Sequence, residues 1–168
     1  MNRKLKKLII LDRDGVLVES PKYPERYILE ANKVIIRESL NRVIAHLQKE
    51  VIFAVATNQQ CVGKGLISRE ALEEIHAKIN QSVLKKGGIE MKFYVCPHLE
   101  IENCTCRKPR PGLLKKAIHE SKVNEVENIF FIGDQESDAN AAKALGIKYF
   151  QSSSEKEVIN TLKSITKI

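Results

Sequence analysis

The sequence predicts an α/β fold in three layers, with helices on both faces of a central parallel sheet. Short continuous apolar runs, which are typical of strands buried on both faces, alternate along the chain with segments of helical periodicity. Polar residues follow three of these runs directly, as expected where strand ends deliver side chains to one crevice. With 168 residues, of which 43% are hydrophobic, the chain suits one domain, which we expect to span residues 1–168.

Five apolar runs are the expected strands. Three of them end abruptly at polar residues, and the other two are shorter or less regular. In chain order the runs are Leu8–Leu11, Val51–Ala56, Met91–Val95, Ile129–Ile132 and Ile147–Phe150. Because helical segments separate them, the strands are expected to be parallel.

Helical periodicity predicts helices between and after these runs. Ser68 suits the N-cap of one helix, Pro111 suits the first turn of another, and Gly146 suits the end of a third. The expected apolar faces consist of Leu40, Val43, Ile44 and Leu47; of Leu72, Ile75, Ile79 and Val83; of Ala139, Ala142 and Leu145; and of Val158, Leu162 and Ile165. These faces would cover the two sides of the sheet.

The chain carries a formal net charge of +7, with a pI of about 9.2. This excess suits a solvated lysine-rich surface, or attraction to nucleic acid, an acidic membrane or small phosphorylated molecules, and charge alone does not decide between them. No stretch approaches the roughly 20 apolar residues that span a bilayer, and Leu8–Leu11 is too short for a signal peptide. We therefore expect a cytoplasmic protein without a membrane partner, whose basic start is a solvated lead-in made of Arg3, Lys4, Lys6 and Lys7. A monomer is a separate expectation.

Two acidic residues, Asp12 and Asp14, follow the first expected strand and are separated by one residue. Carboxylates this close repel each other unless a divalent cation and a phosphate share the site, and oxygen ligands suit Mg²⁺. Gly15 permits a backbone turn that a residue with a side chain would resist. The alternative is an ordinary turn with solvated acids.

Two further segments could contact a phosphate. Thr57 to Gln60 follow the second expected strand and offer hydroxyl and amide donors, although a polar turn accounts for them equally well. The segment Arg107–Gly112 contains two prolines, which stiffen it and can aim Lys108 and its arginines at an anion. The alternative for this segment is a solvated basic turn.

A second acidic pair, Asp134 and Asp138, follows the run Ile129–Ile132. The two residues are four positions apart, so they share one face of the helix that begins there. The alternative is a pair of acids without a site, because helix N-termini favour acidic side chains in any case.

Four potential metal ligands crowd into eleven residues: Cys96, His98, Cys104 and Cys106. Three thiolates and one imidazole suit a closed, four-coordinate structural zinc site, whereas the alternative is a chance cluster of cysteines. We expect the zinc loop to span residues 96–110 and to aim the adjoining Arg107 and Lys108 at the phosphate. Cys61 lies outside the cluster and is expected to be a free thiol.

Taken in order, these segments resemble the signature of the haloacid dehalogenase (HAD) superfamily of phosphohydrolases. That signature is D-x-D-G, then a strand-end Thr or Ser, then a Lys, then an acidic G-D-x-x-x-D. Each motif alone is weak, but their order and spacing over nearly the whole chain are specific. The resemblance implies a three-layer, Rossmann-like HAD fold, and the chain has no long insertion that could build a large cap domain.

The resemblance also implies a role for each motif residue. Asp12 would attack phosphorus and become an aspartyl-phosphate, which splits one difficult hydrolysis into two easier steps. Asp14 would protonate the leaving oxygen and then take a proton from the incoming water. Thr57 and Lys108 would stabilise the transferring phosphoryl group, whose oxygens carry the spread charge.

The implied magnesium ligands are Asp12, the backbone carbonyl of Asp14, and Asp134. Asp138 would support these ligands instead of binding the ion directly. The expected cofactors are therefore Mg²⁺ at the strand ends and Zn²⁺ in the loop.

A zinc loop next to C-R-K-P is similar to the group that contains D-glycero-D-manno-heptose 1,7-bisphosphate phosphatases and histidinol-phosphate phosphatases. The segment Thr57–Gly65 is similar to the heptose type, whereas the gap of five residues between His98 and Cys104 is closer to the histidinol-phosphate type. Removal of the 7-phosphate of the heptose bisphosphate, in carbohydrate metabolism, is the first expectation, and histidinol phosphate is the second. Cys61 and Val16 depart from the pattern, where glycine and threonine are usual.

Polynucleotide 3′-phosphatases share T-N-Q and R-K-P and are a third alternative. However, aromatic residues make up only 5% of the chain and Trp is absent, so a stacking platform for bases and a nucleic-acid partner are not expected. A binding module without catalysis is least favoured, because every catalytic position is filled. A small phosphorylated substrate is expected to contact short loops, through Ser20, Pro21, Lys22, Tyr23, Asn58, Gln59, Gln60 and Arg107.

Overall fold

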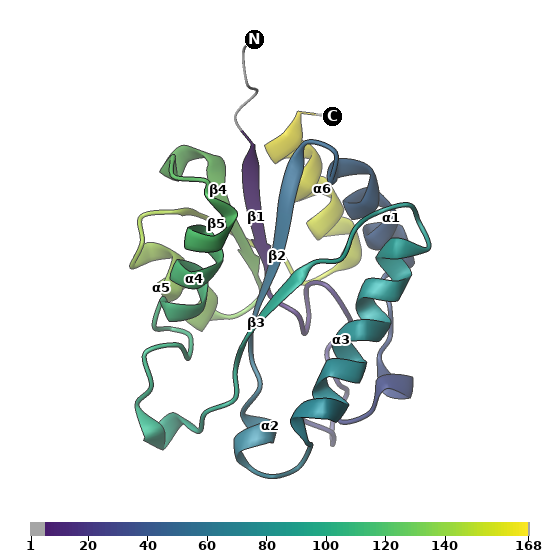
Figure 1. Ribbon diagram of the computed structural model, residues 1–168, viewed down its shortest axis with the longest axis vertical. Helices are drawn as coiled ribbons and strands as arrows, with labels where there is room; N and C mark the ends of the chain where they lie inside the picture. Colours follow the sequence, from purple (N-terminus) through teal and green to yellow (C-terminus); the bar gives the residue numbers. More distant parts are fainter. Residues whose placement is uncertain (1–5, 168) are drawn as a thin grey trace.

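Five parallel strands form one sheet in the computed structural model, which describes residues 6–167 (Figure 1). Their order is β3-β2-β1-β4-β5, so β1 lies at the centre. The bounds are β1 Lys7–Leu11, β2 Val51–Asn58, β3 Lys92–Cys96, β4 Ile129–Gly133 and β5 Lys148–Gln151. The predicted parallel sheet is confirmed. Arg3 and Lys4 of the expected basic lead-in lie outside the described residues.

The helices form a layer on each face of the sheet (Figure 1). α1, α3 and α6 pack against one face, and α4 and α5 pack against the other. The bounds are α1 Glu38–Leu47, α2 Gln60–Gly63, α3 Arg69–Leu84, α4 Gly112–Ser121, α5 Glu136–Lys143 and α6 Glu155–Thr166, with short 3₁₀ helices at Ala31–Lys33, Glu100–Glu102 and Val126–Asn128. This confirms the predicted three-layer architecture.

β1 needs a continuous apolar run because both of its faces are buried. Ile9 and Leu11 pack into the core under α1, α3 and α6, while Leu8 and Ile10 pack into the core under α4 and α5. Successive side chains of a strand point to opposite faces, so a polar residue at any of these positions would be buried. Burial of each of these side chains stabilises the fold by roughly 1.5–3 kcal/mol.

β2 is two residues longer than predicted. Thr57 and Asn58 continue the strand and pair with Val95 and Cys96 of β3. An apolar run could not reveal this, because the pairing is made by the backbone while the side chains at the end of the strand are polar. The two residues are therefore held by the sheet instead of by a loop.

The helix ends agree with most of the predicted signals. Ser68 caps α3, since its Oγ accepts a hydrogen bond from the backbone N–H of Ala71 at 3.1 Å. Pro111 is the N-cap of α4 and not a residue of its first turn. Leu145 and Gly146 lie beyond α5, and Gly146 adopts a φ of +65° in the turn to β5.

The strand order brings the polar residues that follow β1, β2 and β4 to one edge of the sheet. β1 lies between β2 and β4, with Leu11 paired to Val55 on one side and to Ile132 on the other. The residues that follow these three strands are therefore neighbours, although they are far apart in the sequence. The carboxyl ends of the central strands carry the candidate site.

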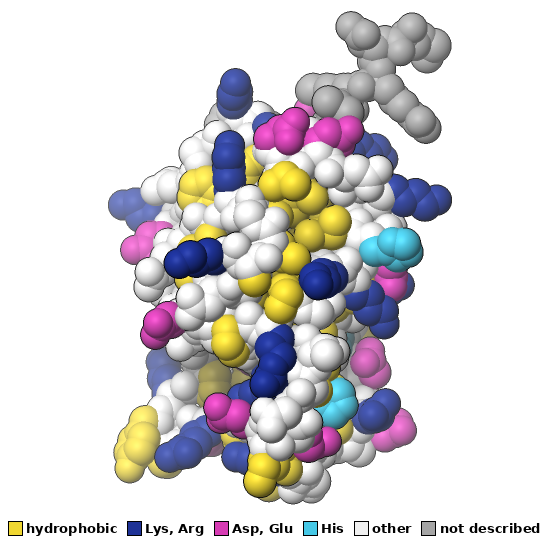
Figure 2. Space-filling model, turned by 90° about the vertical axis from the view of Figure 1, so that its left-hand side faces the viewer, with side chains coloured by type: hydrophobic (Ala, Val, Ile, Leu, Met, Phe, Trp, Pro, Cys, Tyr) yellow, Lys and Arg dark blue, Asp and Glu magenta, His cyan; other side chains and the backbone are white. Residues whose placement is uncertain are grey.

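The surface over α4 and α5 shows how the positive charge is distributed (Figure 2). On this face, Lys and Arg side chains stand singly, with acidic and apolar side chains between them. Such spacing is typical of a solvated surface. Across residues 6–167, no helix combines the length and the apolar character needed to cross a bilayer.

Candidate active site

Three carboxylates meet at the carboxyl ends of β1 and β4. Asp12 follows β1, Asp134 follows β4, and Asp138 lies in the first turn of α5. One oxygen from each lies within 4.8 Å of the others, and we call these three residues the acidic cluster. The structure thus brings together Asp12 and Asp134 as predicted, and it adds the Asp138 carboxylate to the same group.

Lys108 is the cation of the acidic cluster. Its Nζ lies 2.7 Å from Asp12 Oδ1 and 2.6 Å from Asp138 Oδ1, and it donates to the carbonyl oxygen of Ala56 at 2.9 Å. Asn58 fixes the backbone of Lys108 with two hydrogen bonds, one donated at 3.0 Å and one accepted at 3.1 Å. The end of β2 therefore holds the lysine against the cluster.

The electrostatics of the acidic cluster favour a divalent cation. Burial raises the pKa of Asp12 to about 7, against the opposing attraction of Lys108. Burial also raises the pKa of Asp134, whose Oδ1 is buried and has no hydrogen-bond partner among the described residues. Three carboxylates beside one lysine leave an excess of negative charge. Carboxylate oxygens are donors that Mg²⁺ prefers, so the residues present fit this ion.

Asp138 and Asp134 differ in what their carboxylate oxygens contact. Asp138 Oδ1 faces Lys108, and its Oδ2 accepts a hydrogen bond from the backbone N–H of Gln135 at 3.2 Å. Asp134 keeps one oxygen free of protein donors among the described residues. Asp134 is therefore better placed to bind an ion, and Asp138 to hold the lysine.

Glycines allow the cluster to be this tight. Gly15 has a φ of +88°, and a Cβ there would lie 2.3 Å from Asp134 Oδ2 and 2.9 Å from Ser20 Oγ. A Cβ on Gly133 would lie 2.5 Å from the Cβ of Asp138. Any side chain at either position would collide with the cluster.

Asp14 points elsewhere. Its carboxylate accepts two hydrogen bonds from Arg13, from Nε at 2.9 Å and from Nη2 at 2.8 Å, and a third from Gln59 Nε2 at 2.8 Å. The same Gln59 nitrogen donates to Thr57 Oγ1 at 2.8 Å. The Asp14 side chain keeps 28% of its surface exposed and lies outside the group of possible metal ligands found among residues 6–167.

A cavity of about 370 Å³ opens over these residues. Its lining consists of Asp12, Asp14, Ser20, Pro21, Glu25, Arg26, Thr57, Asn58, Lys108, Asp134, Gln135, Ser137 and Asp138. All four predicted catalytic residues are among them. Four lining residues were not predicted from the sequence, because no motif gave them a role: Glu25, Arg26, Gln135 and Ser137.

The predicted substrate contacts divide into two groups. Ser20, Pro21 and Asn58 line the cavity, whereas the other five do not. Lys22 lines a neighbouring cavity of about 350 Å³, and Tyr23 is 97% exposed. The three that remain contact the protein or lie back from the cavity: Gln59 bridges Asp14 and Thr57, Gln60 donates to the hydroxyl of Tyr27, and Arg107 has a buried Nη1.

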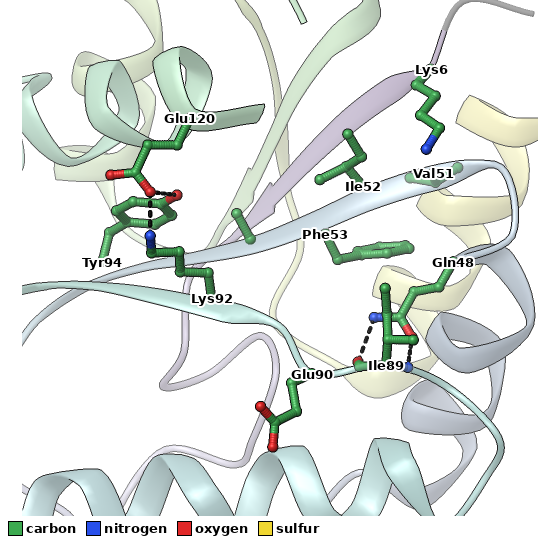
Figure 3. A pocket seen from close by; sticks show the side chains of 11 residues that line it. Lys6, Gln48, Val51, Ile52, Phe53, Ile89, Glu90, Lys92, Tyr94 and Glu120 are labelled. Atoms are coloured by element: carbon green, nitrogen blue, oxygen red, sulfur yellow. Dashed lines mark hydrogen bonds and ion pairs between the residues drawn. The ribbon is translucent and has the colours of Figure 1, made fainter. Parts of the chain in front are cut away.

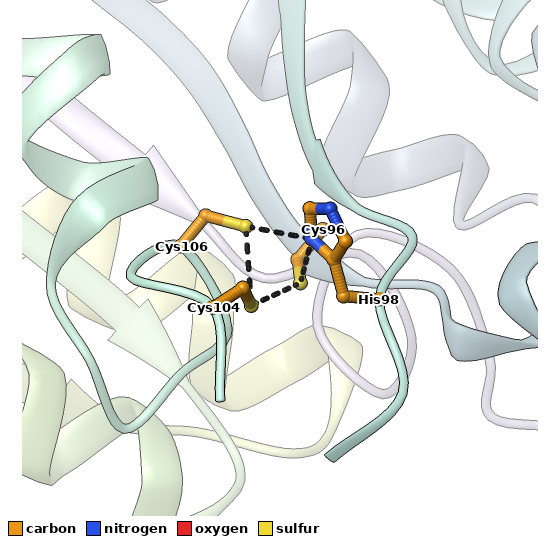
Figure 4. Close-up of side chains that lie close together, drawn as sticks. All are labelled: Cys96, His98, Cys104 and Cys106. Carbon is orange, nitrogen blue, oxygen red and sulfur yellow. Dashed lines mark hydrogen bonds between the residues drawn. The ribbon is translucent and has the colours of Figure 1, made fainter. Parts of the chain in front are cut away.

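The predicted zinc ligands converge at the last residue of β3 and in the loop that follows it (Figure 4). Adjacent ligand atoms are 3.2–3.6 Å apart: Cys96 Sγ, His98 Nδ1, Cys106 Sγ and Cys104 Sγ. Tetrahedral bonds of zinc length give ligand–ligand distances of about 3.6–3.8 Å. Burial raises the pKa of the Cys96 thiol, which a dication would counter, and the backbone N–H of Arg107 donates to Cys104 Sγ at 3.4 Å. The four residues, which we call the Cys3His cluster, fit Zn²⁺.

Another hollow, of about 320 Å³, lies at the opposite end of β2 and β3 (Figure 3). Two of its four charged side chains, Lys92 and Glu120, pair with each other, and the hydroxyl of Tyr94 donates to Glu120 at 3.0 Å. Ligands of parallel sheets bind at the carboxyl ends of the strands, and this hollow lies at the amino ends. The candidate site is therefore the cavity over the acidic cluster.

The fold and the site define a class of protein, the α/β phosphatases in which acidic side chains at strand ends meet a buried lysine. A family model described as "Polynucleotide kinase 3 phosphatase" matches residues 7–161. The chain belongs to the haloacid dehalogenase superfamily of phosphatases. The resemblance, the fold class and the enzyme class predicted from the motifs are thereby confirmed.

Two similar proteins and one similar crystal structure show which members of the superfamily the chain resembles. A D-glycero-beta-D-manno-heptose-1,7-bisphosphate 7-phosphatase of Pseudomonas putida is 38% identical over 141 residues, which cover 83% of this chain and 78% of that protein. The histidine biosynthesis bifunctional protein HisB of Campylobacter jejuni is 35% identical over 144 residues, which cover 84% of this chain but only 40% of that protein. A crystal structure of D,D-heptose 1,7-bisphosphate phosphatase from B. bronchiseptica, complexed with magnesium and phosphate, has a TM-score of 0.78 at 29% identity and covers 92% of this chain and 86% of that one.

Proposed function

We propose that the protein is a magnesium-dependent phosphomonoesterase that removes the 7-phosphate of D-glycero-D-manno-heptose 1,7-bisphosphate through an aspartyl-phosphate at Asp12. The observation that carries the proposal is the acidic cluster, in contact with the buried Lys108 and open to a cavity. The choice of substrate is supported by the heptose bisphosphate phosphatases among the relatives and by the segment Thr57–Gly65. We further propose one domain, a monomeric state and a cytoplasmic location.

The proposed chemistry follows from where each side chain lies. A carboxylate oxygen of Asp12 forms a bond to phosphorus while the bond from phosphorus to the sugar oxygen breaks. Asp14 donates a proton to that oxygen, and it later takes a proton from the water that attacks the aspartyl-phosphate. Because Thr57 Oγ1 accepts from Gln59, its own hydrogen is free to donate to the phosphoryl oxygens. Lys108 adds positive charge beside Asp12.

Mg²⁺ would be held by Asp12, Asp134 and the backbone carbonyl of Asp14, with Asp138 in support. It would supply charge neutralisation for the phosphoryl oxygens during transfer. Zn²⁺ would be held by the Cys3His cluster, as a structural ion. In this scheme, zinc fixes the loop that delivers Lys108, and it takes no part in the chemistry.

Histidinol phosphate is the second candidate substrate, favoured by the HisB match and by the short gap between His98 and Cys104. A 3′-phosphorylated polynucleotide is the third, favoured by the description of the family model. All three share a phosphate monoester, so the chemistry at Asp12 would be the same. The candidates differ in what the loops around the cavity must accommodate.

The test is magnesium-dependent phosphate release from the heptose bisphosphate, histidinol phosphate and a 3′-phosphorylated oligonucleotide, compared by kcat/KM. We expect the heptose bisphosphate to give the highest value. A higher value for either of the other substrates would replace the substrate while leaving the chemistry intact. Absence of magnesium-dependent release from all three would contradict the proposed function.

A further inference from the structure

The Asp14 carboxylate is held away from the acidic cluster by a charged residue that is wholly buried. Arg13 has no exposed surface and binds both oxygens of Asp14. A buried guanidinium is costly unless its charge is paired, and Asp14 supplies that pairing. Such a two-bond contact also fixes the plane of the carboxylate, so Arg13 determines where its oxygens lie.

His76 of α3 supports Arg13 from the other side. Its Nε2 lies 3.4 Å from Arg13 Nη1, and its ring stacks on Phe93 of β3 with ring centroids 4.1 Å apart. Burial, together with the charge of Arg13, lowers the pKa of His76 to about 3, so the ring is neutral and Nε2 can accept from the guanidinium. The imidazole is almost fully buried, and the 63 residues that separate it from Arg13 make this a contact between distant segments.

Gln59 completes the arrangement at the end of β2. Its amide nitrogen donates to both Asp14 and Thr57, so one side chain spaces the proposed proton donor from the proposed phosphoryl contact. The thiol of Cys61 lies 3.5 Å from the amide oxygen of Gln59, which favours this orientation of the amide. Asp14 is thus gripped from two sides while its remaining surface faces the cavity.

We propose that Arg13 and His76 are positioning residues that hold the Asp14 carboxyl group on the leaving-group side of the cavity and keep it from joining the cation site. This inference rests on the proposed function. Arg13 acts directly on Asp14, and His76 acts through Arg13. Neither lines the cavity, and neither belongs to the acidic cluster.

The step they serve is proton transfer to the leaving group. As the bond from Asp12 to phosphorus forms, the electron pair of the breaking P–O bond passes to the ester oxygen. A proton that Asp14 has first taken from solvent on its cavity side moves to that oxygen, which leaves Asp14 as the carboxylate that pairs with Arg13. An alkyl alcohol leaves poorly without this proton, whereas an acidic phenol leaves well as its anion. The loss of activity that a misplaced Asp14 causes must therefore depend on the leaving group.

The experiment compares kcat/KM for an alkyl ester, the heptose bisphosphate, with kcat/KM for p-nitrophenyl phosphate. For Arg13→Met we expect a loss of about 30-fold on the alkyl ester and of about 3-fold or less on the aryl ester, since general acid catalysis contributes roughly 10²–10⁴-fold. His76→Leu should show the same selectivity with a loss of about 5-fold, and His76→Gln, which retains an acceptor, should restore most of it. In an Asp14→Asn background, Arg13→Met should cause no further loss on the alkyl ester.

Equal losses on both esters would overturn the inference, because a purely structural ion pair would affect every substrate alike. Unchanged kinetics in both variants would overturn it as well. If Arg13→Met does not fold, as judged by circular dichroism, His76→Leu carries the same comparison, with His76→Gln as its control. Failure of the unaltered protein to release phosphate from any phosphate ester would instead contradict the proposed function, so the two failures are distinguishable.

Discussion

The acidic cluster and the Cys3His cluster both fit a metal ion, yet they are built on opposite plans. The acidic cluster keeps a buried oxygen of Asp134 without a partner among the described residues and opens onto a cavity of about 370 Å³. The Cys3His cluster closes on itself, since its ligand atoms form a ring of contacts at 3.2–3.6 Å (Figure 4). In the proposed scheme, an oxygen left free for an ion distinguishes the reactive site, whereas a closed set of four ligands distinguishes the structural one.

The two clusters are joined by a very short piece of chain. Cys106 belongs to one of them, and Lys108, two residues later, is the cation of the other. Asn58 fixes the backbone of this junction to the end of β2. Each of the following predictions perturbs one cluster, or the link between them, and they run from the largest expected effect to the smallest.

Asp12→Asn should abolish activity on phosphate monoesters, with a loss of roughly 10⁴-fold or more, because an amide cannot form the aspartyl-phosphate. The fold should persist, since Asn fills the same space. Steady-state phosphate release measures the effect, with Glu127→Gln, a change at an exposed acid, as the control. Normal turnover by the Asn variant would show that the acidic cluster is not the reactive site.

Zinc removal should reduce both stability and activity. Without zinc, the four side chains of the Cys3His cluster would no longer be held together, and Lys108 would no longer be held beside Asp12. We expect a loss of roughly 10–100-fold in kcat, as when groups that orient a site from outside it are removed. Metal content, Tm and kcat are to be measured after chelation once magnesium has been added back, and again after zinc has been added back. A zinc-free protein that is fully active and equally stable would refute the link between the clusters.

Asn58→Ala should weaken the link without touching either cluster. The loss of two hydrogen bonds should cost about 1–3 kcal/mol of stability, and displacement of Lys108 should lower kcat by about 10-fold.

Asn80→Ala is the matched control, because Asn80 makes the same pair of hydrogen bonds, at 3.1 and 3.0 Å, with the backbone of Met91. It should lose similar stability and keep its kcat. Equal kcat values in the two variants would mean that the clamp on Lys108 serves folding alone.

The pH dependence of stability should report on the acidic cluster without any change of sequence. Burial raises the pKa of Asp12 from 3.8 to about 7, so in the metal-free protein the folded state retains a proton that the unfolded state releases. Stability should therefore fall as pH rises from about 4 to 7 and level off above, a change of roughly 10 °C in Tm. Magnesium should flatten this slope by favouring the ionised carboxylate. A slope of the opposite sign would contradict the assigned cause.

The parts of the site that lie at strand ends could be predicted from the sequence, because parallel strands place their carboxyl ends along one edge. This holds for Asp12, Asp134 and Thr57. The convergence of the Cys3His cluster was predictable on different grounds, since three cysteines and a histidine at such close spacing are typical of a metal site. Patterns visible along the chain were therefore sufficient to predict both groups of residues.

Contacts between distant segments were not predictable. Arg13 lies inside the first motif, where no role was predicted for it, yet it is buried against His76 of α3. Arg26 lines the cavity only because of the path of the loop between β1 and α1. Tyr23, three residues earlier in the same loop, was predicted to contact substrate and is 97% exposed. Spacing along the chain carries no information about such packing.

The most direct measurement of the central claim is to trap the covalent intermediate. The protein is mixed with magnesium and substrate, quenched within one turnover and reduced with borohydride, which converts an aspartyl-phosphate to homoserine. Peptide mass spectrometry then locates the converted residue. We predict homoserine at position 12 and at no other aspartate; conversion at a different residue, or none during rapid turnover, would contradict the account.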